Sequence, residues 1–195
     1  MRLQAPRADH PDRTAAYAVN FALGGHFLSR LNRNLREDKG YTYGSGSRLA
    51  TGRSSGTWDI SVDVQTQHVA EAMVEIEREL DLIARDGAEP SEIEAAWLED
   101  VQTWNRTMLT ASTAVSRWAY LLEEEKSIED ALQFLDALRA LSPADTQQVA
   151  ERWLGAEQAR VWVVTGDRTT LESELAESGL EVSWHTPDDA IFGRF

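Results

Sequence analysis

The spacing of apolar residues predicts two helices at the start of the chain. After Pro11, apolar residues recur every three or four positions as far as Leu23, and the pair Gly24-Gly25 is typical of a helix end. A second helix is predicted from about Phe27, with Gly40 as its C-terminal cap. Its expected apolar face consists of Phe27, Leu28, Leu31 and Leu35, and its expected exposed face consists of Arg30, Asn32, Arg33 and Asn34.

The period of the pattern then changes from helical to two, which predicts a β-hairpin. Over 41–49 the odd-numbered residues, Tyr41 to Leu49, form one face of the expected strand and the even-numbered residues form the other. Over 57–64 the apolar residues Trp58, Ile60, Val62 and Val64 alternate with polar ones, and a turn is expected over 51–56. Tyr41 and Tyr43 lie on the same face of the first strand in this pattern. We therefore expect the hairpin to bury one face.

Helical patterns fill most of the next ninety residues. An apolar stripe from Val69 to Ile83 predicts an amphipathic helix that ends at Gly87. Ser91 with Glu94 is the expected capping box of a long helix that continues to Met108. The apolar faces of these and the following helix include Trp97, Trp104 and Trp118, which are expected to pack in the core.

Three further helices and two strands complete the predicted elements. One helix covers 114–122, a second begins at Ser127 with Asp130, and a third begins at Ser142-Pro143 and ends at Gly155. Strands are expected over 161–164 and 180–184, with a short helix over 170–178 between them. These elements predict an α+β fold, in which helices pack on a mainly antiparallel sheet, and a single domain over residues 1–195. Four predicted strands are few for so many helices, so the sheet is expected to lack a member at its N-terminal end.

Composition excludes several classes of function. The 195 residues include 33 acidic and 19 basic side chains, and a net charge of -14 argues against binding to nucleic acid or anionic lipid. The absence of cysteine excludes disulfides, thiol catalysis, zinc fingers and iron–sulfur clusters. No stretch is apolar for the roughly 20 residues that a membrane-spanning helix needs.

The histidines do not form a metal-binding motif. The chain has four, His10, His26, His68 and His185, and no two are spaced to ligate from one helix face, so both His-Glu-x-x-His and its inverse are absent. His26 could join Glu37 and another carboxylate only through tertiary contacts, and a structural role for it is favoured. We therefore predict no metal site within this chain.

The segment 23–46 resembles a known peptidase family. Leu23-Gly24-Gly25, Ser29-Arg30-Leu31, Leu35-Arg36-Glu37, Gly40 and Tyr43 match the signature in the C-terminal half of the insulinase/pitrilysin family of zinc metallopeptidases, which includes the mitochondrial processing peptidase. The resemblance extends over nearly the whole chain, to the Val163-Val164-Thr165-Gly166-Asp167 stretch.

The resemblance implies catalytic and substrate-binding roles for two residues. In such enzymes one half carries His-x-x-Glu-His with zinc, and the other contributes an arginine and a tyrosine seven residues apart, as Arg36 and Tyr43 are. Tyr43 would donate a hydrogen bond to the scissile carbonyl or its oxyanion, and Arg36 would hold the peptide backbone nearby. Tyr41 is the competing candidate for the tyrosine role and a further candidate for substrate binding.

The resemblance also implies a partner. Because the zinc motif is absent, zinc is expected on a partner half or subunit, and this chain alone should not hydrolyse peptides. The alternatives are a catalytically silent scaffolding paralogue and a fragment of a longer, self-sufficient peptidase. Family members open with a further strand, of which only 3–5 would remain here, so association of copies through an exposed sheet edge is expected. The compartment would be the cytoplasm if Met1 is the true start, or the periplasm if a leader has been lost.

Overall fold

The computed structural model describes residues 1–123, 125–176, 178 and 180–186 of the chain. Over these residues it has an antiparallel sheet with helices packed against it, which confirms the predicted α+β class. The strands are β1 (Arg2–Ala5), β2 (Thr42–Thr51) and β3 (Gly56–Val64), in the order β1-β3-β2. Strands β2 and β3 form the hairpin that the alternating pattern predicts.

Two short helical segments precede the hairpin and lie against it. Helix α1 (Arg13–Asn20) continues into the π-helical turn η1 (Phe21–Gly25), and α2 (Arg30–Asn32) continues into the π-helical turn η2 (Arg33–Asp38). The remaining helices are η3 (Thr66–His68), α3 (Val69–Asp86), α4 (Pro90–Thr107), α5 (Ala111–Glu123), α6 (Ile128–Arg139), α7 (Pro143–Leu154) and α8 (Arg168–Leu175). Among the described residues, none of these helices is long and apolar enough to span a bilayer.

The core forms where the sheet meets α1, α3 and α7. Trp58 of β3 is fully buried, and the predicted stripe of α3 is buried along its whole length from Val69 to Ile83. Val149 and Leu154 of α7 pack into the same cluster. This burial removes a large apolar area from water, which supplies the main driving force for folding.

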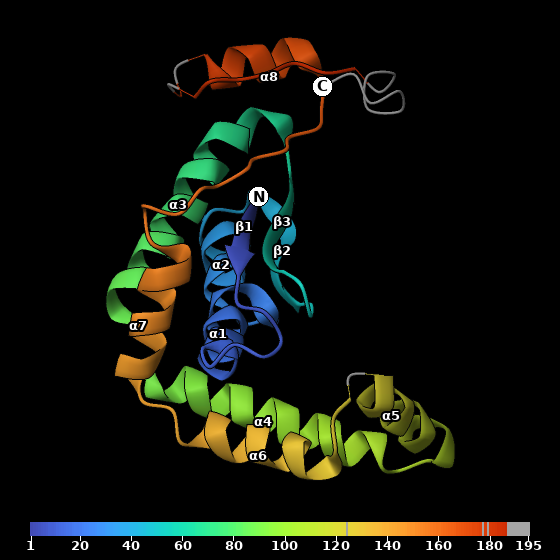
Figure 1. The fold of residues 1–195 in the computed structure, drawn as a ribbon. Coiled ribbons are helices and arrows are strands. Elements are labelled where there is room, and N and C mark those ends of the chain that lie inside the picture. The colour runs from blue at the N-terminus through green and yellow to red at the C-terminus, as the bar shows by residue number, and fades with distance from the viewer. Residues whose placement is uncertain (124, 177, 179, 187–195) are drawn as a thin grey trace.

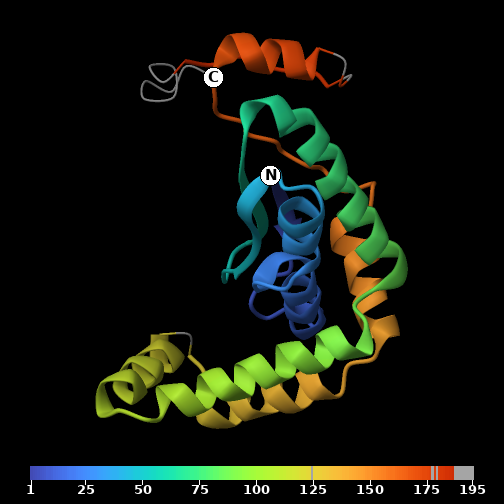
Figure 2. The same ribbon diagram turned by 180° about the vertical axis from the view of Figure 1, so that it is seen from behind.

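Helices α4 and α6 form an arm that extends away from the sheet (Figures 1 and 2). They lie side by side, and α5 connects their far ends and turns back toward the tip of the β2–β3 hairpin. At that tip Arg53 donates hydrogen bonds to the Glu123 carbonyl, 2.6 Å away, and to Glu125 Oε1, 3.2 Å away. The arm thus contacts α1 and η1 at its base and the hairpin tip near its far end.

Two predicted strands are wrong. Residues 162–165 and 180–184 have no regular structure, and the first segment keeps only one antiparallel bridge, between Val161 and Arg2. β1 pairs with the first four residues of β3, from Gly56 to Asp59. The rest of β3, together with 162–165, lines a cavity of about 280 Å³ instead of continuing the ladder. An apolar run such as 161–164 predicts a strand only where a neighbouring strand supplies the hydrogen bonds.

Other local predictions need correction. Helix α4 begins two residues earlier than predicted, because Glu89 and Glu92 form its capping box in place of Ser91 and Glu94. Trp118 is 50% exposed, and Trp97 and Trp104 are half-buried and lie outside the core clusters of the described residues, so the prediction that these tryptophans pack in the core is wrong. The second predicted helix is reversed in part: Phe27 and Leu28 are exposed, while Asn32 and Asn34 are buried.

Candidate functional site

The double glycine allows the end of the first helix to touch strand β2. A Cβ atom on Gly24 would lie 2.5 Å from the backbone nitrogen of Ser47, closer than any side chain permits. Glycine at this position therefore lets η1 pack directly on the strand. The contact places the next segment, from His26 to Asp38, beside the start of β2.

Contacts from two asparagines, Asn32, which is buried, and Asn20, which is half-buried, hold this arrangement. The Asn32 side-chain oxygen accepts a hydrogen bond from the Ser45 backbone nitrogen at 2.8 Å. One helical segment earlier, the Ser47 hydroxyl donates to the Asn20 side-chain oxygen at 2.8 Å. The polarity of Asn32 predicts an exposed position for it, and the apolar pattern assigns no role to Asn20. The one feature of the sequence that could have indicated a role for Asn20 is its position, one helical turn before the double glycine.

Arg36 lies on η2 and is half-buried. Its Cζ atom lies 4.3 Å from the centre of the Phe27 ring, which is itself 62% exposed. Such a cation–π contact restricts the side chain without using its N–H donors. Among the described residues no hydrogen bond, ion pair or ring contact joins Arg36 to Tyr41 or Tyr43.

The backbone reverses direction at Gly40 and enters β2 through an irregular pairing. Gly40 has a φ of +66°, which favours glycine, and the Tyr41 N–H returns to the Leu35 carbonyl at 2.9 Å. The pairing of β2 with β3 shifts between Thr42 and Ser45, where the Thr42 hydroxyl contacts the Gly44 backbone. This bulge re-aims the side chain between them, as β-bulges commonly do.

Tyr43 projects into solvent from this bulge. Its relative exposure is 101%, so nothing in the described chain covers its ring or pairs with its hydroxyl. Its phenol is therefore available to a second molecule. The structure places Arg36 and Tyr43 on the surface of adjacent elements, neither of them sealed in the core.

Tyr41, the competing candidate, is engaged within the chain. Its ring stacks on His68 at 4.6 Å between centroids, and its hydroxyl pairs with Glu71. Partial burial and the Glu71 carboxylate together raise the pKa of the Tyr41 phenol. The hydrogen bonds from His68 and Tyr41 lower the pKa of Glu71. The two tyrosines therefore do not share one environment, contrary to the alternation of the sequence.

Polar contacts attach η2 and the following Lys39 to α3. Asn34 donates to Glu75 and Glu79 at 2.9 and 2.7 Å, and Lys39 pairs with Glu75 at 2.7 Å. These bonds, with Lys39 contributing most, lower the pKa of Glu75 to about 2. Glu75 therefore stays ionised throughout the physiological range.

The described residues offer no metal site. No group of three or more histidine, cysteine, aspartate or glutamate side chains among them is placed to hold an ion. His26 is used structurally: its ring stacks on Phe21 at 4.1 Å, and its Nδ1 atom lies 2.8 Å from the Phe21 carbonyl oxygen. This geometry does not bring His26 together with Glu37.

Comparisons with known proteins agree on one family and one fold. Residues 1–97 match the sequence pattern described as the peptidase M16 inactive domain. A search among curated proteins finds no significant match.

Several solved structures have the same fold. The inactive peptidase domain of a candidate zinc protease from Bordetella parapertussis aligns with a TM-score of 0.68 at 16% identity, covering 86% of this chain and 92% of that one. The peptidase M16 inactive domain from Pseudomonas fluorescens aligns with a TM-score of 0.66 at 18% identity, covering 78% and 37%. The first half of the periplasmic protease PqqL from Escherichia coli aligns at 0.56 and 13%, covering 95% and 44%. The chain spans little more than a third of the Pseudomonas fluorescens chain. At these identities the likeness shows the fold alone.

Proposed function

This chain belongs to the peptidase M16 family, whose inactive-domain pattern it carries over residues 1–97, and we propose that it is the substrate-binding half of a two-part zinc metalloendopeptidase. It would bind peptides or unfolded protein segments together with a half that carries His-x-x-Glu-His and zinc. In this arrangement Arg36 and Tyr43 contribute to an active site that the other half completes. The whole active unit would therefore need a heterodimer or a longer chain.

One observation carries the proposal: Tyr43 presents its entire side chain to solvent, and the neighbouring segment η2 holds a half-buried Arg36 against the exposed Phe27 ring. A fully exposed tyrosine at a β-bulge has no packing role that would explain its position. A phenol that donates to a developing oxyanion is worth roughly 3 to 4 kcal/mol in a site from which water is excluded. The second polypeptide would supply that exclusion of water.

Arg36 has a complementary role in this proposal. The guanidinium rests on the Phe27 ring and keeps its N–H donors free of described carboxylates. A planar donor group of this kind can hold peptide carbonyl oxygens or a carboxylate by two parallel hydrogen bonds. Arg36 would therefore fix the path of the substrate, and Tyr43 would act on the reacting carbonyl.

The test is reconstitution with a candidate zinc half. Activity toward an unstructured fluorogenic peptide is measured for the wild type, Arg36→Gln and Tyr43→Phe, each with its affinity for the zinc half. We expect Tyr43→Phe to lower kcat by roughly 10² with little change in that affinity. Arg85→Gln, at an exposed arginine on α3 that pairs with Asp86, is the control and should leave kcat unchanged. Unchanged kcat in Tyr43→Phe and Arg36→Gln would overturn the catalytic role.

A second function is supported by the exposed apolar residues of the same segment. Phe27 and Leu28 are 62% and 63% exposed side by side, which is typical of a surface that another protein covers. A scaffolding paralogue would need this surface without the chemistry of Tyr43. In that case Leu28→Ser would weaken association with the zinc half, while Tyr43→Phe would leave peptide cleavage by the pair unaltered.

A further inference from the structure

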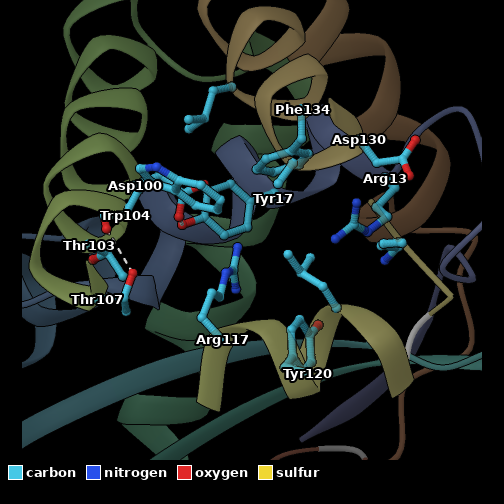
Figure 3. Close-up of a pocket in the computed structure, with 14 residues that line it drawn as sticks. Arg13, Tyr17, Asp100, Thr103, Trp104, Thr107, Arg117, Tyr120, Asp130 and Phe134 are labelled. Atoms are coloured by element: carbon cyan, nitrogen blue, oxygen red, sulfur yellow. Dashed lines mark hydrogen bonds between the residues drawn. The ribbon is translucent and has the colours of Figure 1, made fainter. Parts of the chain in front are cut away.

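A cavity of about 210 Å³ lies where the arm meets α1 (Figure 3). It is separate from Arg36 and Tyr43, neither of which lines it. Helices α1, α4, α5 and α6 all contribute to its wall. Four aromatic rings form much of that wall: Tyr17, Trp104, Tyr120 and Phe134.

Two arginines extend into this cavity from different sides (Figure 3). The Arg13 guanidinium lies over the Phe134 ring, with its Cζ atom 5.0 Å from the ring centre. The Arg117 guanidinium lies between Trp104 and Tyr120, at 5.4 and 5.5 Å from the two ring centres. Within the described part of the chain, no carboxylate lies within ion-pair distance of either guanidinium.

Two carboxylates, those of Asp100 and Asp130, line the cavity itself. Asp100 accepts a hydrogen bond from the Tyr17 hydroxyl at 3.2 Å. Asp130 caps α6 by accepting hydrogen bonds from the Ser127 backbone nitrogen and hydroxyl, at 2.7 and 2.8 Å. Both acidic groups thus have hydrogen-bond donors of their own. In a chain with a net charge of -14, two guanidiniums that share a cavity without an ion-paired carboxylate are unusual. The charges of both guanidiniums nevertheless act on the nearby Asp100 carboxyl group.

The geometry points to a binding site for a carboxylate carried on a flat apolar group. Its carboxylate would lie between the Arg13 and Arg117 guanidiniums, each of which presents several N–H donors in one plane. Its flat body would pack against the rings of Trp104 and Tyr17. A cationic ligand is disfavoured, because both guanidiniums already cover ring faces and would repel it.

Two sources could provide this chemistry: a free aromatic carboxylic acid, or a polypeptide that ends in an aromatic residue. The cavity volume suits a body of one or two fused rings, and it is smaller than sites for drug-sized ligands. Binding by the free acid and by the peptide terminus can be compared directly, because both present a ring and a carboxylate and only the peptide adds a backbone.

The test uses 2-naphthoate and its neutral isostere 2-naphthamide as probes of the full chain. Binding is followed by calorimetry and by the indole N–H resonances in a nitrogen-15 correlation spectrum. We expect saturable binding of naphthoate that shifts the Trp104 resonance, and binding of the amide that is weaker by roughly ten-fold or more. Acetyl-Gly-Phe and its C-terminal amide form the second arm. Tighter binding of the peptide acid than of naphthoate would assign the site to polypeptide termini, and the reverse order would assign it to small acids.

Variants then separate a binding role from a structural one. Arg13→Gln and Arg117→Gln should each weaken naphthoate binding by about ten-fold, and Arg117→Lys should lose less because it keeps the charge. Arg139→Gln is the matched control, since Arg139 lies 4.7 Å from the Trp97 ring and lines no part of this cavity. The correlation spectrum of each variant reports whether it is folded. Equal affinity for acid and amide, or unchanged affinity in both folded glutamine variants, would overturn the proposal.

Discussion

Arg30 and Glu92 form a two-point ion pair that joins the second helical segment to the first turn of α4. The Arg30 Nε atom lies 2.9 Å from Glu92 Oε1, and its terminal nitrogen lies 2.5 Å from Oε2. Both side chains are only 14% exposed, and Arg30 also donates to the Gly87 carbonyl at 3.0 Å. Glu92 in turn accepts from the Glu89 backbone nitrogen at 2.8 Å and so completes the capping box. The pair therefore links the segment that carries Arg36 to the base of the arm.

Removing one partner of this pair should be costly. We expect Arg30→Gln to lower the free energy of unfolding by about 2 to 3 kcal/mol, because Glu92 is left largely buried without its counter-charge. Urea denaturation at pH 7 measures the change. Arg168→Gln is the control, since Arg168 pairs with Glu172 on an exposed surface, and it should cost less than about 0.5 kcal/mol. Equal losses in the two variants would contradict the role of burial.

The same pair predicts a pH dependence. Burial alone would raise the pKa of Glu92, but the hydrogen bonds from Arg30 and the Glu89 backbone outweigh it and hold the pKa below its ordinary value. A carboxylate whose pKa is lowered by folding stabilises the protein above its unfolded pKa and loses that contribution as the pH falls. The stability difference between wild type and Arg30→Gln should therefore shrink as the pH falls below about 4. A difference that is constant from pH 7 to pH 3 would show that the ion pair contributes nothing.

Gly24→Ala should destabilise the fold by about 1 to 3 kcal/mol. The added methyl group would meet the backbone nitrogen of Ser47 at 2.5 Å, and a backbone atom cannot move aside without shifting β2. Thermal unfolding followed by circular dichroism is sufficient to detect the change. Gly44→Ala provides the comparison, because its Cβ atom would meet nothing within 4 Å. A clearly larger loss in Gly44→Ala would mean that the close contact of η1 with β2 is not what glycine protects.

Asp100 and Asp130 should respond to neutralisation with opposite signs. Burial raises the pKa of Asp100 despite the Tyr17 hydrogen bond, whereas the bonds from Ser127 lower the pKa of Asp130. Folding therefore disfavours the Asp100 anion and favours the Asp130 anion. Asp100→Asn is expected to stabilise the protein at pH 7 by less than about 1 kcal/mol, and this gain should vanish at low pH. Asp130→Asn is expected to destabilise it. Urea denaturation of both variants at pH 7 and pH 3 measures the two signs, and a loss of stability in Asp100→Asn at pH 7 would contradict the expectation.

The charges around Asp100 also affect the proposed anion site. Arg13 and Tyr17 of α1, Glu99 of α4 and Arg117 of α5 act on its carboxyl group, and Lys126 and Asp130 line the same cavity. An asparagine in place of Asp100 no longer repels a bound carboxylate, so Asp100→Asn should strengthen naphthoate binding at pH 7. Calorimetry on the variant measures this, and weaker binding would contradict the assignment of the carboxylate to this cavity.

Association through the open edge of the sheet is a further expectation. Val163 is 76% exposed and lines the cavity beside β3, where the β1–β3 ladder has ended. Unpaired strand edges are prone to pair with another chain. Native mass spectrometry at tens of micromolar should therefore show species larger than a monomer, and Val163→Lys should reduce them. Val115→Lys, at an exposed site on α5, should not. A clean monomer for the wild type would contradict the expectation.

The sequence correctly predicts those helices and strands whose apolar residues recur with the period of the element because one face is buried. The stripe of α3 and the alternation of β2 and β3 follow from which faces are buried, and both predictions are confirmed. For the segment 27–35 the predicted face is wrong in part, because Asn32 and Asn34 are buried by specific partners that polarity alone does not indicate. The strand predicted at 161–164 would need a neighbouring strand to pair with, and the apolar pattern of this segment does not show whether one is present.

The candidate site was predictable only in part. The roles of Arg36 and Tyr43 were predicted from their spacing and the family resemblance. The alternating pattern placed Tyr41 and Tyr43 on the same face of the strand, but the bulge turns Tyr43 outward and breaks that alternation. The cavity that contains Arg13 and Arg117 joins residues about a hundred positions apart. Its composition depends on how α5 turns back along the arm, which no local pattern specifies.

The contact of Arg53 with the end of α5 has a mechanical consequence. The Arg53 and Glu125 side chains are 62% and 79% exposed, so water competes for their ion pair and the contact is weak. Such a contact breaks and re-forms readily. The far end of α5 can then move, while the Arg30–Glu92 ion pair holds the base of α4 in place. The hairpin tip can therefore move relative to the end of α5 without exposing Trp58 or Ile83, which are buried in the main core.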